Sequence, residues 1–76
     1  MLKIKDNVDL KELEKYGFVK GNTMGEIFYE KSYFKGFYKE KIIIWQKDRE
    51  LQVQAIKLLN TLYDLIKADL VEKVED

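Results

Sequence analysis

Residues 26–46 constrain the fold more than any other part of the chain, because aromatic and β-branched side chains dominate them. Such side chains fit the pleated surface of a sheet. The pair Lys35-Gly36 divides this stretch, which predicts one strand over residues 26–34 and a second over residues 37–46. Polar and apolar residues then alternate over residues 50–54, at the period of a third strand. We therefore expect a three-stranded antiparallel meander.

Helical signals precede the predicted meander. Asp9 is a favourable N-cap residue, Glu12 lies three positions later, and apolar residues follow at helical spacing. Gly17 comes directly after the last of them, as at many helix C-termini. We predict a helix that ends at Gly17, then a short strand at residues 18–20 and a loop at residues 21–25.

The region after the meander allows two interpretations. The apolar residues from Leu51 to Ile66 fit the stripe of one long helix, and they also fit a strand at residues 50–54 followed by a helix from about Ala55. We favour the strand because of the alternation noted above. Thr61 and Asp64 have the spacing of a capping box, or else they are two exposed polar residues inside the helix.

The end of the chain repeats the pattern of its beginning. Residues 62–71 match residues 10–19 in apolar spacing, with Asp69 at the position of Gly17. Asp tolerates the left-handed backbone conformation better than most residues with a side chain. Both segments therefore predict a helix, a left-handed residue and a strand. The fold class is α+β: one domain over residues 1–76, with the meander and short strands as a small antiparallel sheet and two helices packed on one face.

Composition excludes most catalytic chemistry. The chain contains neither cysteine nor histidine, so disulfides, the usual zinc sites and every Ser-His or Cys-His arrangement are impossible. The glycines of residues 21–25 lack the Lys-Ser/Thr of a phosphate-binding loop. We expect no enzymatic activity, no cofactor and no metal site. No apolar run is long enough for a signal peptide or a membrane span, so we expect a cytoplasmic protein with no membrane partner.

Charge and aromatic content leave nucleic acid as an open possibility. The 14 Lys and Arg residues balance the 14 Asp and Glu residues, and a single arginine, Arg49, is present, which argues against a reader of duplex DNA. Residues 31–41 interleave aromatic rings with lysines, as single-strand binders do. Alternate residues of a strand face opposite sides, however, so an ordinary solvated hairpin explains the pattern better.

Residues 42–45 are four consecutive apolar residues, which predicts a strand covered on both faces. The second cover would be a partner protein, a second copy of the chain, or its own helices or N-terminal arm. We expect a partner to bind the sheet region that includes Ile42 and Ile44. The candidate partner-binding residues are Tyr33, Lys35, Phe37, Tyr38, Lys39 and Trp45.

Two terminal segments, NVDLKELEKYGF at residues 7–18 and LYDLIKADLVEKV at residues 62–74, resemble the ends of small uncharacterised proteins of phages and prophages of low-GC Gram-positive bacteria. Those proteins usually carry Gly where this chain has Asp69. No catalytic residues are assigned in that group, and the resemblance implies a phage protein that binds and occludes a host or defence protein.

The function hypothesis is accordingly a non-enzymatic, protein-binding accessory factor of phage or prophage type. Its most specific form is an inhibitor of a bacterial defence system, of the anti-CRISPR or anti-restriction kind. The alternatives are a single-stranded nucleic-acid-binding module that uses the Tyr/Phe/Lys hairpin, and a structural homodimer.

Overall fold

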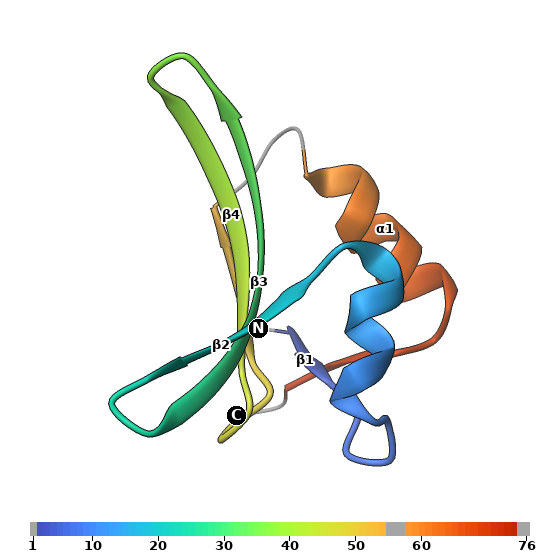
Figure 1. Ribbon diagram of the computed structural model, residues 1–76. Helices are drawn as coiled ribbons and strands as arrows, with labels where there is room; N and C mark the ends of the chain where they lie inside the picture. The colour runs from blue at the N-terminus through green and yellow to red at the C-terminus, as the bar shows by residue number, and fades with distance from the viewer. Residues whose placement is uncertain (1, 55–57, 75–76) are drawn as a thin grey trace.

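A computed structural model describes residues 2–54 and 58–74, which form a mixed fold of helices and antiparallel strands (Figure 1). In chain order the elements are β1 (Leu2–Ile4), the 3-10 helix η1 (Leu10–Tyr16), β2 (Val19–Thr23), β3 (Glu26–Lys35), β4 (Tyr38–Trp45), β5 (Leu51–Gln54), α1 (Leu59–Lys67) and β6 (Val71–Lys73).

The main sheet is an antiparallel meander in the order β2-β3-β4-β5, so the predicted three-stranded meander is extended by β2, which was predicted as a shorter separate strand. The difference arises at residues 21–23, which were expected in a loop but pair with β3. Gly21 is not a turn residue: a Cβ atom there would lie 2.4 Å from the Phe28 ring, so the glycine makes room for that ring. The turn is shorter than predicted. It consists of Met24 and Gly25, both with positive φ, as a type I′ hairpin turn requires.

A second, two-stranded sheet joins the two ends of the described chain. β1 pairs antiparallel with β6, with Leu2 opposite Lys73 and Ile4 opposite Val71. The final strand was predicted as part of the same sheet as the meander, which is wrong, since it belongs to this separate sheet. Its partner β1 was not predicted, because three residues are too short to show a period. The Ile4 N–H donates to the Arg49 carbonyl at 2.9 Å, which ties this sheet to the β4–β5 turn.

Strand followed by helix is the correct interpretation of the region after the meander. β5 pairs with β4 from Leu51 to Gln54, and α1 begins at Leu59; the predicted start near Ala55 falls outside the described residues. The capping box is wrong, since the N-cap residue is Leu58 and no side chain caps it locally. Thr61 is buried in the first turns of α1, so it is not an exposed helix residue either, while Asp64 is exposed.

The two predicted corners share the same hydrogen bonds. Gly17 has a φ of 90° and Asp69 a φ of 62°. Phe18 N–H donates to the Leu13 carbonyl at 3.3 Å, and Leu70 N–H donates to the Leu65 carbonyl at 3.1 Å, five residues earlier in both cases. The sequence repeat is therefore a repeat of structure, although the first helix has 3-10 geometry and the second is an α-helix.

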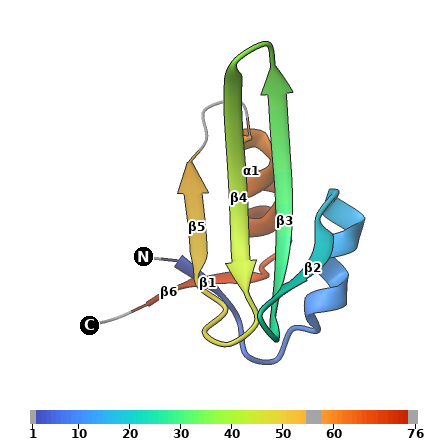
Figure 2. The ribbon, with the colours of Figure 1, turned by 60° about the vertical axis from the view of Figure 1, so that its left-hand side comes forward.

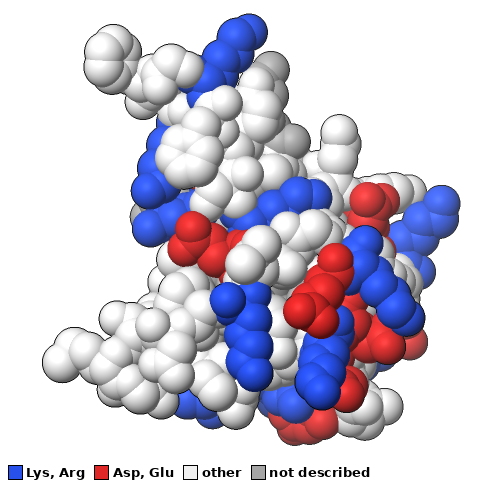
Figure 3. Space-filling view, in the orientation of Figure 1, with Lys and Arg blue, Asp and Glu red and all other residues white. Residues whose placement is uncertain are grey.

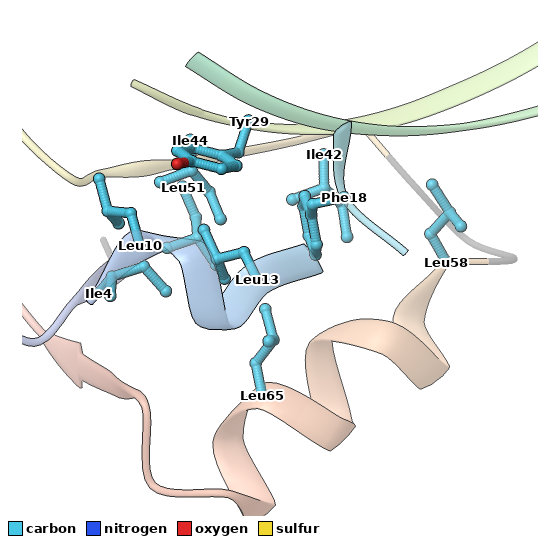
Figure 4. Packing of buried hydrophobic residues seen from close by; sticks show 10 residues of the cluster. All are labelled: Ile4, Leu10, Leu13, Phe18, Tyr29, Ile42, Ile44, Leu51, Leu58 and Leu65. Atoms are coloured by element: carbon cyan, nitrogen blue, oxygen red, sulfur yellow. The ribbon is translucent and has the colours of Figure 1, made fainter. Parts of the chain in front are cut away.

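Both helices cover the same face of the main sheet, which we call the inner face (Figure 1). Figure 4 shows the core between the helices and the sheet, with Leu13 and Leu65 directed toward the sheet. The buried cluster consists of Ile4, Leu10, Leu13, Phe18, Tyr29, Ile42, Ile44, Leu51, Leu58 and Leu65. No helix or strand among the described residues covers the opposite, outer face (Figure 2).

Candidate functional site

Two strands of the main sheet extend beyond their neighbours. Among the described residues, the β2–β3 pairing ends at Val19 and Glu30, and the β4–β5 pairing ends at Lys41 and Gln54. Residues 31–40, which we call the hairpin arm, therefore project from the body as a two-stranded ribbon (Figure 2). Its loop is Gly36-Phe37, with a φ of 61° at Gly36, the position where a type II′ turn needs glycine.

The arm exposes aromatic side chains. Phe37 at the tip is fully exposed, at 109% of its reference area, and Phe34 is 65% exposed. Tyr38 is 43% exposed. Figure 3 shows blue and white surface over the projecting end of the arm, with red surface only lower down. The arm therefore offers apolar rings and positive charge to solvent.

The pairing register assigns each candidate residue to a face. Ile42 and Ile44 belong to the core, so every second residue of β4, and its partner on β3, points to the inner face. This places Tyr33, Lys35 and Tyr38 on the inner face. Phe34 and Lys39 lie on the outer face.

Contacts between side chains follow these faces. The rings of Tyr33 and Tyr38 meet edge to face, with centroids 6.4 Å apart. On the other side, Lys39 Nζ lies 5.4 Å from the centroid of the Phe34 ring, a cation–π contact. The candidate residues of the arm thus form one ring pair on the inner face and one cation–ring pair on the outer face, with Phe37 between them at the tip.

Three of the other expected residues lie apart from this group. Ile42 and Ile44 are completely buried against the helices, so the expectation that they bind a partner is wrong. Trp45 is seven residues from Tyr38, or about 23 Å along the strand. Its ring packs against Phe28 on the outer face, with centroids 5.2 Å apart. The arm, without Trp45, is therefore the candidate site.

Two charged residues of the arm serve the fold. Lys31 points inward, and its Nζ donates to the Tyr16 carbonyl and to Thr61 Oγ1, both at 2.8 Å. Glu40 is buried, and its carboxylate accepts from the Leu58 N–H at 3.0 Å and from the Tyr38 hydroxyl. The hydrogen bond to Glu40 raises the pKa of Tyr38. Lys31, which sequence reasoning grouped with lysines that follow a nucleic-acid backbone, is thus not available for that role.

The exposed cations of the arm are Lys35 and Lys39. The side chain of the single arginine, Arg49, also forms hydrogen bonds within the fold. Arg49 Nη1 donates to the carbonyls of Lys5 and Val8, at 2.8 and 2.7 Å.

A surface cavity lies where β2 ends, and sequence reasoning did not find it. Its volume is about 520 Å³, and the residues around it include Val19, Phe28, Glu30 and Ser32. All four lie on the outer face by the pairing register. No local signal marks this cavity, because it depends on where one strand stops beside another.

Within residues 2–54 and 58–74, no group of three acidic, histidine or cysteine side chains could hold a metal ion. Neither helix in that part of the chain has the length and apolar character needed to cross a membrane. Comparison of the chain with family models, curated proteins and solved structures gave no match.

Proposed function

We propose that the protein is a non-enzymatic, protein-binding accessory factor that engages its partner through the hairpin arm. The observation that carries this proposal is Phe37, a fully exposed phenylalanine at the tip of a two-residue loop. Aromatic side chains dominate the binding energy of many protein interfaces when they fill a pocket of the partner. A short loop fixes such a ring in position, which lowers the entropy lost on binding.

The placement of the rings favours a protein partner over single-stranded nucleic acid. Stacking of successive bases needs several aromatic faces along one surface. Here Tyr33 and Tyr38 face inward, Phe34 faces outward, and Phe37 stands alone at the tip. A protein surface can surround such an arm on both sides, whereas a single strand can follow just one of them.

The most specific form of the proposal is an inhibitor of a bacterial defence system, of the anti-CRISPR or anti-restriction kind, acting in the cytoplasm of a phage-infected cell. Its support is the resemblance of the two terminal segments to phage and prophage proteins. The shape of the molecule is compatible with this role, because a projecting arm on a small body can occlude a groove of a larger protein (Figure 1).

Capture from a lysate of a Gram-positive host, with the purified chain immobilised, tests the proposal. The test variant is Phe37→Ala. The matched control is Met24→Ala, because Met24 is also fully exposed and lies in the two-residue loop of the other hairpin. We expect a protein that both the parent chain and the control retain, and that the Phe37 variant retains about tenfold less. Equal retention by all three chains would contradict the proposal.

Two further measurements separate the alternatives. Binding of a fluorescent single-stranded oligonucleotide that weakens steeply with salt, and that Tyr33→Ala and Tyr38→Ala abolish, would support the nucleic-acid module. Sedimentation that changes with protein concentration would support the homodimer. We expect neither result for the parent chain.

A further inference from the structure

The hairpin arm has an unpaired edge on β3. The Gln46 N–H donates to the Ile27 carbonyl at 3.0 Å, so the odd-numbered residues of β3 direct their backbone groups toward β4. The even-numbered residues direct theirs to the other side, where β2 pairs with Glu26, Phe28 and Glu30. Beyond Glu30 this side is open at Ser32 and Phe34 (Figure 2).

These open positions can pair with a further strand. Ser32 and Phe34 each present an N–H donor and a carbonyl acceptor, and among the described residues no backbone group bonds to them. An edge of this kind can accept an added strand from another chain. The cavity beside Val19 and Ser32 lies at the end of this edge that is nearest to β2. A strand that continues the line of β2 along β3 would therefore pass the cavity.

We propose that an extended segment of the partner protein adds to this edge as a strand that pairs with Ser32 and Phe34. This inference rests on the proposed function, because it specifies how the partner of the hairpin arm binds. Side chains opposite Ser32 and Phe34 lie on the outer face, where they meet the cavity and the exposed Phe34 ring. Those two positions of the partner segment are therefore apolar.

The position between them is acidic. A side chain opposite Tyr33 lies on the inner face, diagonal to Lys31 and Lys35. Lys31 is held by Tyr16 and Thr61, whereas Lys35 is exposed and forms no ion pair within the described part of the chain. The recognised segment thus has the alternating pattern apolar, acidic, apolar.

Charge argues against a second copy of the chain as the added strand. Two antiparallel copies of this edge, centred on Tyr33, would place Lys31 of one copy opposite Lys35 of the other at both ends of the pairing. Like charges directly opposite one another destabilise a strand pair. The exposed Lys35 attracts an acidic segment instead, so the edge selects against self-association and for a partner of opposite charge.

Amide chemical shifts and hydrogen exchange of the full chain test this inference. The probe is a blocked peptide with Val-Asp-Val between threonines, added at about millimolar concentration, where short strand peptides bind. Its control is the same peptide with Val-Lys-Val. We expect the Asp peptide to shift the amide signals of Ser32 and Phe34 and to slow their exchange. The amide of Lys39 on the opposite edge should not change, and the Lys peptide should bind about tenfold more weakly.

A backbone variant provides the second measurement. Ser32→Pro deletes the donor that faces the open edge, and Lys39→Pro deletes the corresponding donor on the opposite edge. We expect the first variant to bind the Asp peptide about tenfold more weakly and the second to bind as the parent does. Thermal melts verify that both variants fold. If one variant does not fold, the hydrogen-exchange measurement on the parent chain still tests the inference.

Two results would overturn the inference: an absence of protection at Ser32 and Phe34 with the Asp peptide, or equal effects at Lys39. Failure of the proposed function itself would look different, because it is measured by the dependence of capture on Phe37. A partner lost with Phe37→Ala but retained by Ser32→Pro would leave the arm as the binding site and eliminate the added strand.

Discussion

Lys31 connects three elements of the fold, β3, η1 and α1. It extends from β3 toward the helices, where its ammonium group bonds to the last carbonyl of η1 and to the Thr61 hydroxyl in α1. A carbonyl at a helix C-terminus carries partial negative charge and favours a cation nearby. Gly17 completes the arrangement, because a Cβ atom there would lie 3.2 Å from Lys31 Nζ.

Replacement of Lys31 by methionine should destabilise the fold. The substitution keeps most of the aliphatic stem but leaves the Tyr16 carbonyl and the Thr61 hydroxyl without their partner, at a cost of about 1–3 kcal/mol in the free energy of unfolding. The control is Lys35→Met, on the same face of the same strand but exposed, which should change that free energy by less than about 0.5 kcal/mol. Urea unfolding of both variants measures the difference. Equal stabilities would show that the two hydrogen bonds contribute nothing.

Asp69 allows a prediction of the opposite sign. It has a positive φ, which costs a residue with a side chain about 1 kcal/mol relative to glycine. Its ion pair with Lys5, at 2.7 Å, is largely exposed and contributes little. Asp69→Gly should therefore raise the melting temperature, and Asp69→Asn, which removes only the charge, should leave it nearly unchanged. A lower melting temperature for the glycine variant would mean that the ion pair outweighs the backbone strain.

Local and distant interactions of single residues differ in how well sequence predicts them. Gly17 and Asp69 were predicted as left-handed corners because each follows its own helix, so the signal lies within one segment. Lys31 was assigned to a solvated face, since its partners are 15 and 30 residues away. No spacing rule connects residues that meet only after the helices pack on the sheet.

At the scale of elements, α1 begins in a way that its own sequence does not reveal. Leu58 is the N-cap residue and has no capping side chain. The acceptor comes instead from Glu40 on β4, whose carboxylate bonds to the Leu58 N–H from 18 residues away. A carboxylate at this position also interacts favourably with the positive end of the helix dipole. The apparent capping box at Thr61 was misleading because it lies inside the helix.

Substitutions of Glu40 should measure this cap. Glu40→Leu removes the acceptor of a buried N–H and should cost about 1–3 kcal/mol in the free energy of unfolding. Glu40→Gln keeps a carbonyl oxygen that can accept from Leu58, so its cost should be smaller. Hydrogen exchange of the first amides of α1 distinguishes a local effect from a general one: in the leucine variant, exchange should accelerate there more than in β3 and β4. Uniform acceleration would contradict the cap.

The strands were predicted better than their pairing. Aromatic and β-branched composition marked β3 and β4 correctly, because that preference is local. β2 was cut short at Gly21, since a glycine in a polar segment is typical of a loop. Its actual role is to accept the Phe28 ring of the neighbouring strand, which is information held by two segments together.

At the scale of the whole molecule, the inner face carries stability and the arm carries the candidate site. The aromatic and lysine side chains of the arm could be named from the sequence, whereas their faces could not. A strand register shifted by one residue would exchange the faces of Tyr33 and Phe34. The open edge at Ser32 and Phe34 was equally invisible, because it results from the length of β2 relative to β3.

Stability of the whole domain should fall in alkaline solution. Burial raises the pKa of Tyr29, and Glu14 and Asp9 add to the effect; the hydrogen bond to Glu40 raises the pKa of Tyr38. Hydrogen bonds to Asp6 and Glu12 raise the pKa values of Lys3 and Lys15 in the same direction. The folded state therefore retains these protons at a pH where the unfolded chain releases them. This contribution is complete below the ordinary tyrosine and lysine range and is lost as the pH rises through the folded pKa values.

We accordingly expect a melting temperature that is constant from neutral pH to about pH 9 and that decreases above about pH 10. Tyrosinate absorbance should increase together with unfolding, because burial opposes ionisation of Tyr29 in the folded state. Tyr29→Phe removes one of the responsible groups, so its melting temperature should decrease less steeply with pH. A decrease of identical slope in this variant would assign the alkaline transition to the remaining groups, which are Tyr38 with its hydrogen bond to Glu40 and the lysines Lys3 and Lys15 with their pairs to Asp6 and Glu12.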